Sequence, residues 1–334
     1  MSPFRSIKLQ SNCQLILKFL FTKLASMYIV HTVSAYQSRT CTFPIKILTS
    51  FLRKRRQRVA VNRNVFCAFE INQWDTNLIP DSSYEEEVDE LDSTRIVGGQ
   101  FAVPNQFPFM AVVHRLLGNG MISQCGGTII SSRWVLTAGH CVASGPSKFL
   151  VVFGTCNKTG IDYDSYNGPG VAMLTNKAIL HPNYKITLND IALLYMPRNI
   201  PFRASIQPIK IAGYNYVEKS FAGKTGAVVG WGKDGPSTTG TKRLKYALLP
   251  IISNNECSSY WAVTAKHVCT SASYHQDACQ GDSGGPLIVF KNSVPLQIGI
   301  VSYGDGYCPS NKPGVFTRVD TFIDWIQQVT KLRF

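Results

Sequence analysis

The chain from residue 96 onward consists of short apolar runs that alternate with clusters of Gly, Pro, Asn and Ser. This alternation is typical of many short β-strands in a sandwich or a barrel. The clearest runs lie at residues 109–113, 128–130, 134–136, 149–153, 191–195, 227–229, 287–290 and 298–301. About 239 residues with this pattern fit two small β-barrels packed against each other.

One segment near the C-terminus has helical periodicity instead. Its apolar side chains recur at the spacing of one helix face, while its polar ones lie elsewhere. The apolar set is Val319, Phe322, Ile323, Ile326 and Val329, and the polar set is Asp320, Asp324, Gln327 and Gln328. We therefore expect an all-β fold with one C-terminal helix.

Residues 1–35 have the order of a signal peptide. A basic start is followed by an apolar stretch from Leu24 to Ala35, which ends in the small residues Ser34 and Ala35. The alternative is a signal-anchor formed by residues 14–35, but Lys18 and Lys23 would be costly in lipid. We expect a secreted, extracellular protein without a membrane anchor.

Residues 36–95 have the composition of a pro-region. The basic run 53–56 is either a solvated loop or a dibasic processing site. The acidic block 85–92 follows, and like charges of this density favour an exposed linker. The linker ends at Arg95, so residues 96–334 form a separate predicted domain.

Charge and cysteine content restrict the classes of function. The net charge is +14, of which +10 falls on residues 96–334, but no nucleic-acid, phosphate-loop or dinucleotide motif accompanies it. The ten cysteines include no Cys-x-x-Cys pair, which favours disulfides in an oxidising compartment over zinc or thioredoxin-like sites. We expect no nucleic-acid partner, no cofactor and no metal.

Three short runs contain the candidate chemistry. Ser283 lies in Gly-Asp-Ser-Gly-Gly-Pro, where glycines allow a sharp turn and expose backbone N–H groups. His140 follows an apolar strand beside Cys141, and Asp190 precedes another apolar strand. Taken singly, the three runs suit a turn, a structural histidine and a strand-end acid.

Together, and with Ile96-Val97-Gly98-Gly99 directly after Arg95, these runs resemble the chymotrypsin/trypsin family over about residues 95–334. The resemblance implies two packed six-stranded antiparallel β-barrels with a C-terminal helix. It also implies a serine endopeptidase in which Ser283 is the nucleophile, His140 the base and Asp190 the group that orients it. The N–H groups of Gly281 and Ser283 would form the oxyanion hole.

The same resemblance implies an inactive precursor. Cleavage after Arg95 would release the α-amino group of Ile96, and Asp282 would pair with it to order the site. Because an α-amino group titrates near pH 8, we expect activity to be lost at alkaline pH.

Substrate preference is implied by the residues at the family's pocket positions. Asp277 would form the pocket floor and select Arg or Lys. Ala278 follows it where trypsin has a serine, which favours Arg over Lys. The remaining pocket residues would be Ser302, Tyr303, Gly304 and Gly314.

The family pattern pairs Cys125 with Cys141, Cys257 with Cys269, and Cys279 with Cys308. Cys156 is left over and would bond Cys67, bond another chain or remain a free thiol. Asn157 begins a glycosylation sequon beside it, which predicts an exposed loop.

Some positions depart from the family, and a rival interpretation remains. Gly139 replaces an alanine and would loosen the turn before His140, and Tyr307 is an extra residue at the pocket rim. The expected partners are protein or peptide substrates and protease inhibitors, and we expect a monomer. The alternative is a catalytically weak or inactive homologue that acts as a regulatory binding protein.

Overall fold

The computed structural model describes residues 99–334, except 146, 234–239, 273–277 and 308–309. The predictions for residues 1–98 therefore lie outside the described residues, including the signal peptide, the processing site and the Arg95–Ile96 junction. Within the described ranges, no helix is both long and apolar enough to cross a membrane.

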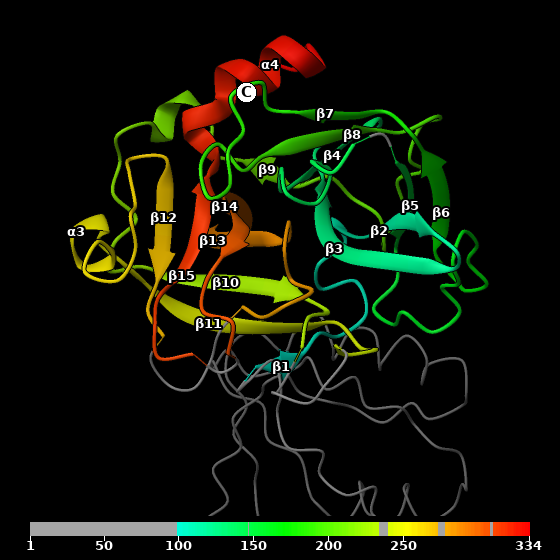
Figure 1. The fold of residues 1–334 in the computed structure, drawn as a ribbon, viewed down its shortest axis with the longest axis horizontal. Helices are drawn as coiled ribbons and strands as arrows, with labels where there is room; N and C mark the ends of the chain where they lie inside the picture. Colours follow the sequence, from blue (N-terminus) through cyan, green and yellow to red (C-terminus); the bar gives the residue numbers. More distant parts are fainter. Residues whose placement is uncertain (1–98, 146, 234–239, 273–277, 308–309) are drawn as a thin grey trace, which may run out of the picture. The chain divides into compact units, whose positions relative to one another are not determined.

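The first half of the described residues forms a seven-stranded antiparallel sheet with the order β6-β5-β2-β3-β4-β8-β7 (Figure 1). Its strands are β2 (Met110–Gly118), β3 (Met121–Ile129), β4 (Trp134–Thr137), β5 (Lys148–Phe153), β6 (Val171–Thr175), β7 (Ala178–Leu180) and β8 (Ala192–Tyr195). Long apolar runs such as 110–113 are buried, because both faces of these strands are covered.

The second half forms a closed barrel of six antiparallel strands. They are β10 (Thr225–Gly230), β11 (Lys245–Ile252), β12 (His267–Thr270), β13 (Pro286–Lys291), β14 (Val294–Tyr303) and β15 (Gly314–Arg318). Pairing between β11 and β12 closes the ring. Two short strands add to it: β1 (Gln100–Phe101) pairs with β11, and β9 (Lys210–Ile211) runs parallel to β14.

The predicted C-terminal helix is confirmed. A 3-10 turn, η3 (Val319–Phe322), leads directly into α4 (Ile323–Thr330). Val319, Phe322, Ile323 and Ile326 are buried, as their spacing predicted. The other helical segments are short: η1 (Tyr214–Tyr216) and α3 (Asn254–Cys257), whose first turn is capped by Ser253.

The two sheets share one apolar core, so the predicted all-β architecture of two packed units is confirmed. The largest buried cluster includes Val113 and Leu136 from the first sheet and Val229 and Ile288 from the second. The second sheet closes as a barrel, whereas the seven strands of the first form an open, curled sheet. This difference lies in strand pairing at the sheet edges, which a hydrophobic pattern does not specify.

Two hydrogen bonds hold the sheets together beside the candidate site. The Gly126 N–H donates to the Ser283 carbonyl at 2.8 Å. The Thr128 hydroxyl donates to Gln297 Oε1 at 2.7 Å, and both side chains are fully buried. Since buried polar groups are costly without partners, these bonds specify how the sheets meet.

Candidate active site

Strand pairing brings His140 and Asp190 together although 50 residues separate them. β4 and β8 are antiparallel neighbours, and Thr137 at the end of β4 lies opposite Ala192 at the start of β8. His140 follows β4 by three residues, and Asp190 precedes β8 by two. In an antiparallel pair, the end of one strand lies beside the start of its neighbour, so the two side chains meet.

The His140–Asp190 contact has two parts. The ring Nδ1 lies 2.8 Å from Asp190 Oδ2, and the backbone N–H of His140 donates to Oδ1 at 2.7 Å. The imidazole is 34% exposed, whereas the carboxylate is 3% exposed. A carboxylate at Nδ1 favours the proton on that nitrogen and leaves the Nε2 lone pair available.

Two further hydroxyls hold Asp190. Ser302 Oγ donates to Oδ2 at 2.5 Å, and Thr317 Oγ1 donates to the main-chain carbonyl at 2.8 Å. Burying a carboxylate is tolerable when donors replace its water, and here both oxygens have them. Asp190 is therefore held rigidly by strands of both sheets.

Ser283 lies in a tight turn that is packed against the end of β4. Its carbonyl accepts from Gly126, and the next N–H, of Gly284, donates to Val301 at 2.9 Å. Gly284 has φ +79°, and a Cβ there would overlap Thr137 Oγ1. Only glycine fits both the backbone conformation and the space.

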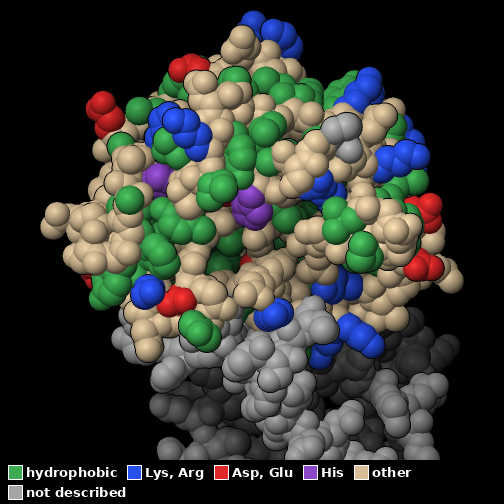
Figure 2. Space-filling view, in the orientation of Figure 1, with side chains coloured by type: hydrophobic (Ala, Val, Ile, Leu, Met, Phe, Trp, Pro, Cys, Tyr) green, Lys and Arg blue, Asp and Glu red, His purple; other side chains and the backbone are tan. Residues whose placement is uncertain are grey.

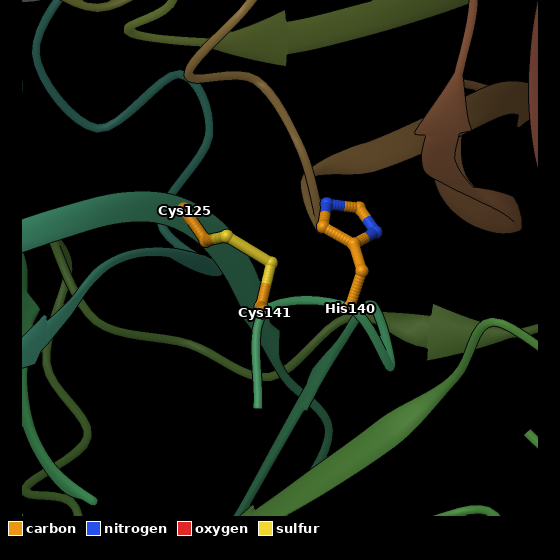
Figure 3. A group of neighbouring side chains, drawn as sticks. All are labelled: Cys125, His140 and Cys141. Carbon is orange, nitrogen blue, oxygen red and sulfur yellow. A yellow bond between two sulfur atoms is a disulfide. The ribbon is translucent and has the colours of Figure 1, made fainter. Parts of the chain in front are cut away.

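The serine turn also contacts the Cys125–Cys141 disulfide next to His140. Cys141 Sγ lies 3.8 Å from the Ser283 carbonyl oxygen. Figure 3 shows the His140 ring beside that disulfide, and a ring nitrogen lies within 4.8 Å of both sulfurs. Among the described residues, Ser283 Oγ makes no direct hydrogen bond with the imidazole, and such bonds are often longer without substrate.

Two backbone N–H groups beside Ser283 are available to a ligand. Within the described ranges, neither the Gly281 N–H nor the Ser283 N–H donates a hydrogen bond. Gly281 has φ +98°, and a Cβ there would lie 3.1 Å from the Gly232 Cα. These amides can therefore receive a negatively charged oxygen.

Asp282 points the opposite way, into the protein, and is fully buried. Its oxygens accept from the N–H groups of Gly232 at 2.7 Å and Cys279 at 2.9 Å. Gly230 and Gly232 make room for it, since a Cβ on either would overlap the carboxylate. Burial raises the pKa of Asp282 to about 6, although the two amides and the charge of Lys158 oppose this.

Comparison with known proteins shows the family of this chain. A family model described as "Trypsin" matches residues 96–326. The chain belongs to the trypsin family of serine endopeptidases.

Its relatives within this family have different names. The chain is 35% identical to "Venom serine protease Bi-VSP" of Bombus ignitus, covering 79% of this chain and 78% of that one. It is 33% identical to "Chymotrypsin" of Phaedon cochleariae (77% and 89% covered) and 35% identical to "Trypsin 5G1" of Aedes aegypti (72% and 86% covered). Among solved structures, "HL collagenase structure at 1.7A resolution" matches with a TM-score of 0.63, 31% identity, and 72% and 100% coverage.

Most predicted pocket residues of this trypsin-family chain lie at or next to the ends of two neighbouring strands. Ser302 and Tyr303 end β14, Gly314 begins β15, and Ala278 is half-buried. A Cβ on Gly304 would meet nothing closer than the Gly314 Cα at 3.9 Å. Gly304 and Gly314 therefore lie close together with no side chain on either, whereas Asp277 lies outside the described residues.

Two predicted disulfides are present, Cys125–Cys141 and Cys257–Cys269. Cys279 is also disulfide-bonded, while its predicted partner Cys308 lies outside the described residues. Cys156 is half-buried and has no disulfide partner within the described ranges, and Cys67 lies outside them. Asn157 is exposed. Cys125, His140 and Cys141 are close enough to hold a metal, but both sulfurs are used by the disulfide.

Several contacts were not anticipated. Gly139 was expected to loosen the turn, yet a Cβ there would lie 2.8 Å from the Tyr184 ring, so neighbouring side chains fill the space. Tyr307, expected at the pocket rim, is 80% exposed. The bond from Ser302 to Asp190 and the place of Lys158 near Asp282 had no local sequence signal, because their partners are distant in the chain.

Proposed function

We propose that this chain is a secreted zymogen that becomes an endopeptidase on cleavage after Arg95 and hydrolyses peptide bonds after Arg, and less efficiently after Lys. One observation carries the proposal: the buried Asp190 orients His140 at the point where the Ser283 turn meets the end of β4. The His140 imidazole is 34% exposed, so a substrate could meet it, and Figure 2 shows histidine side chains at two places on this face of the molecule.

In this proposal Ser283 Oγ attacks the scissile carbonyl while His140 Nε2 accepts its proton. Asp190 stabilises the resulting imidazolium, and His140 then donates the proton to the leaving amine. The Gly281 and Ser283 N–H groups bind the oxyanion. Their lack of protein acceptors among the described residues supports this role, since donors already directed at the reacting oxygen need no rearrangement.

Activation would act through Asp282. Among the described residues, no Lys, Arg or His nitrogen lies within 4.0 Å of its carboxylate. Phe101 pairs with Lys245, which pairs with Gly230, and Gly230 contacts Asp282. Phe101 and Gly230 are two strand spacings apart, which is roughly 10 Å. The chain from Ile96 to Phe101 can span about 17 Å when extended, so a freed Ile96 amine can reach the Asp282 carboxylate.

Arg preference rests on Asp277 and Ala278, as read from the sequence. Ala278 provides no hydroxyl for a lysine ammonium, whereas a guanidinium can bond a carboxylate directly through two N–H groups. The relatives are named chymotrypsin as well as trypsin, so family membership alone leaves the preference open. Gly304 and Gly314 carry no side chain that could obstruct a long substrate side chain, which supports this preference.

The test uses the purified precursor, cut after Arg95, with peptide substrates ending in Arg, Lys, Tyr or Leu. We expect Arg to be hydrolysed fastest, and the Ser283→Ala variant to be inactive. Activity retained by Ser283→Ala would exclude the mechanism. If no substrate is cleaved, the chain is instead an inactive homologue with a binding role.

A further inference from the structure

A polar cluster lies beside Gly281, outside the residues assigned to catalysis. The Lys158 ammonium donates to Gln124 Oε1 at 2.5 Å. The amide nitrogen of Gln124 in turn lies 3.5 Å from the Gly281 carbonyl oxygen. His114 faces Gln124 across the β2–β3 pair. A lysine charge is thus two side-chain contacts away from the proposed oxyanion hole.

The backbone holds Lys158 in this place. Its N–H donates to the Lys242 carbonyl at 2.9 Å, and its neighbour Asn157 forms a β-bridge with Arg243. The Leu244 N–H donates to the Cys156 carbonyl at 2.7 Å. Because three successive residues are tied to the segment before β11, the ammonium is presented from a fixed base rather than from a free loop.

Lys158 has no ionic partner close by. Among the described residues, no carboxylate lies within 4.0 Å of its ammonium. Burial lowers its pKa to about 8, despite the attraction of Asp282. Asp282 does not pair with it, because that carboxylate is fully buried and bonded to two amides. A half-buried cation without a counterion attracts an anionic ligand.

His114 adds no charge to the cluster. It is 5% exposed, and neither ring nitrogen has a hydrogen-bond partner among the described residues. Burial and the charge of Lys158 lower its pKa to about 4, so the ring is neutral near pH 7. The cluster therefore offers one cation, from Lys158, and neutral polar groups around it.

The cluster lies on the leaving-group side of Ser283. The residues proposed to bind the side chain before the cleaved bond, Ser302 to Gly304 and Gly314, come from β14 and β15. On the other side, Ser283 contacts Gly126 and Cys141, and Cys141 is bonded to Cys125, next to Gln124. We therefore expect a substrate chain that enters from the pocket to leave over this disulfide.

We propose that Lys158 selects an acidic side chain within the first two residues after the cleaved bond. This inference rests on the proposed endopeptidase function and extends it to the leaving group. The substrate carboxylate would bond the ammonium, with the Gln124 amide N–H as a second donor beside it. Charge-assisted contacts of this kind favour one substrate over another more than they strengthen binding overall.

The test compares internally quenched peptides that have Arg before the bond and Asp, Asn, Ala or Lys at each of the next two positions. We expect the activated enzyme to favour Asp over Asn by about fivefold in kcat/KM, as for a half-exposed ion pair. Added salt should reduce that ratio in the unmodified enzyme. Asn has nearly the same shape as Asp, so the ratio reports charge.

Variants test whether Lys158 causes the preference for Asp over Asn. Lys158→Met should bring the Asp:Asn ratio to about one, and Lys158→Glu should favour Lys instead. Lys242→Met is the matched control, since Lys242 is exposed and shares the same backbone bond, and it should keep the ratio. Cleavage after Arg with equal rates for Asp and Asn, or a ratio unchanged in Lys158→Met, would refute the inference alone. No cleavage of any peptide would refute the proposed function and this inference with it.

Discussion

Ser302 Oγ lies 2.5 Å from Asp190 Oδ2, the same oxygen that lies 2.8 Å from His140 Nδ1. The hydroxyl comes from the second sheet, whereas Asp190 and His140 belong to the first. The orientation of the imidazole therefore depends on how the two sheets pack, because Asp190 Oδ2 contacts both Ser302 and His140. Ser302 is in this sense a positioning residue for His140.

Removing that hydroxyl should slow catalysis without unfolding the protein. For Ser302→Ala we expect kcat on an Arg substrate to fall at least about tenfold, because a bond to a buried charge is lost. Thr317→Val is the control, since Thr317 bonds only the main-chain oxygen of Asp190. Equal losses of kcat in the two variants, or a matching drop in Tm, would indicate a purely structural role for Ser302.

The buried Asp282 should make the uncut precursor less stable as pH rises. Its folded pKa of about 6 lies above the usual value of 3.8, so its ionisation is penalised by folding. The contribution of the protonated Asp282 to the free energy of unfolding is complete below pH 4. It is lost as pH rises through 6, which lowers that free energy by up to about 3 kcal/mol. Urea unfolding of the Ser283→Ala precursor between pH 4 and 7 measures this, and Asp282→Asn should flatten the curve. An equally steep curve in Asp282→Asn would assign the effect to other groups.

The activated enzyme should lose activity at alkaline pH. In the proposed activated form the Ile96 amine would pair with Asp282 only while it is protonated, and an α-amino group titrates near pH 8, so the pairing would be lost as pH rises further. A kcat/KM profile from pH 7 to 10 should therefore fall at its upper end. Carbamylating the new amine should abolish activity at every pH, and full activity after that modification would contradict the activation mechanism.

Adding one hydroxyl to the proposed pocket should change its preference between Lys and Arg. Ala278→Ser supplies an acceptor for a lysine ammonium, so hydrolysis after Lys should improve relative to Arg by about two- to tenfold. The measurement is the ratio of kcat/KM for matched Lys and Arg peptides, with Thr317→Val, outside the proposed pocket residues, as the control that should keep the ratio. An unaltered ratio in Ala278→Ser would mean that Ala278 does not contact the substrate side chain.

The sequence alone determined the local features of this protein. Apolar runs predicted eight of the strands, and 3.6-residue periodicity predicted α4, because both patterns depend on near neighbours. The runs around His140, Asp190 and Ser283 indicated the family, because each motif consists of consecutive residues and is visible without the fold. The Cys125–Cys141 and Cys257–Cys269 bonds followed from that resemblance.

Only the tertiary structure decided which distant groups meet. Ser302 and Asp190 are 112 residues apart, and Gln124 and Gly281 are 157 apart. Such contacts depend on strand register and on how the two sheets pack, which no window of the sequence contains. The sequence shows Lys158 only as part of the glycosylation sequon that begins at Asn157. The β-bridge between Asn157 and Arg243, a tertiary contact, places the Lys158 charge beside Gln124 and so near Gly281.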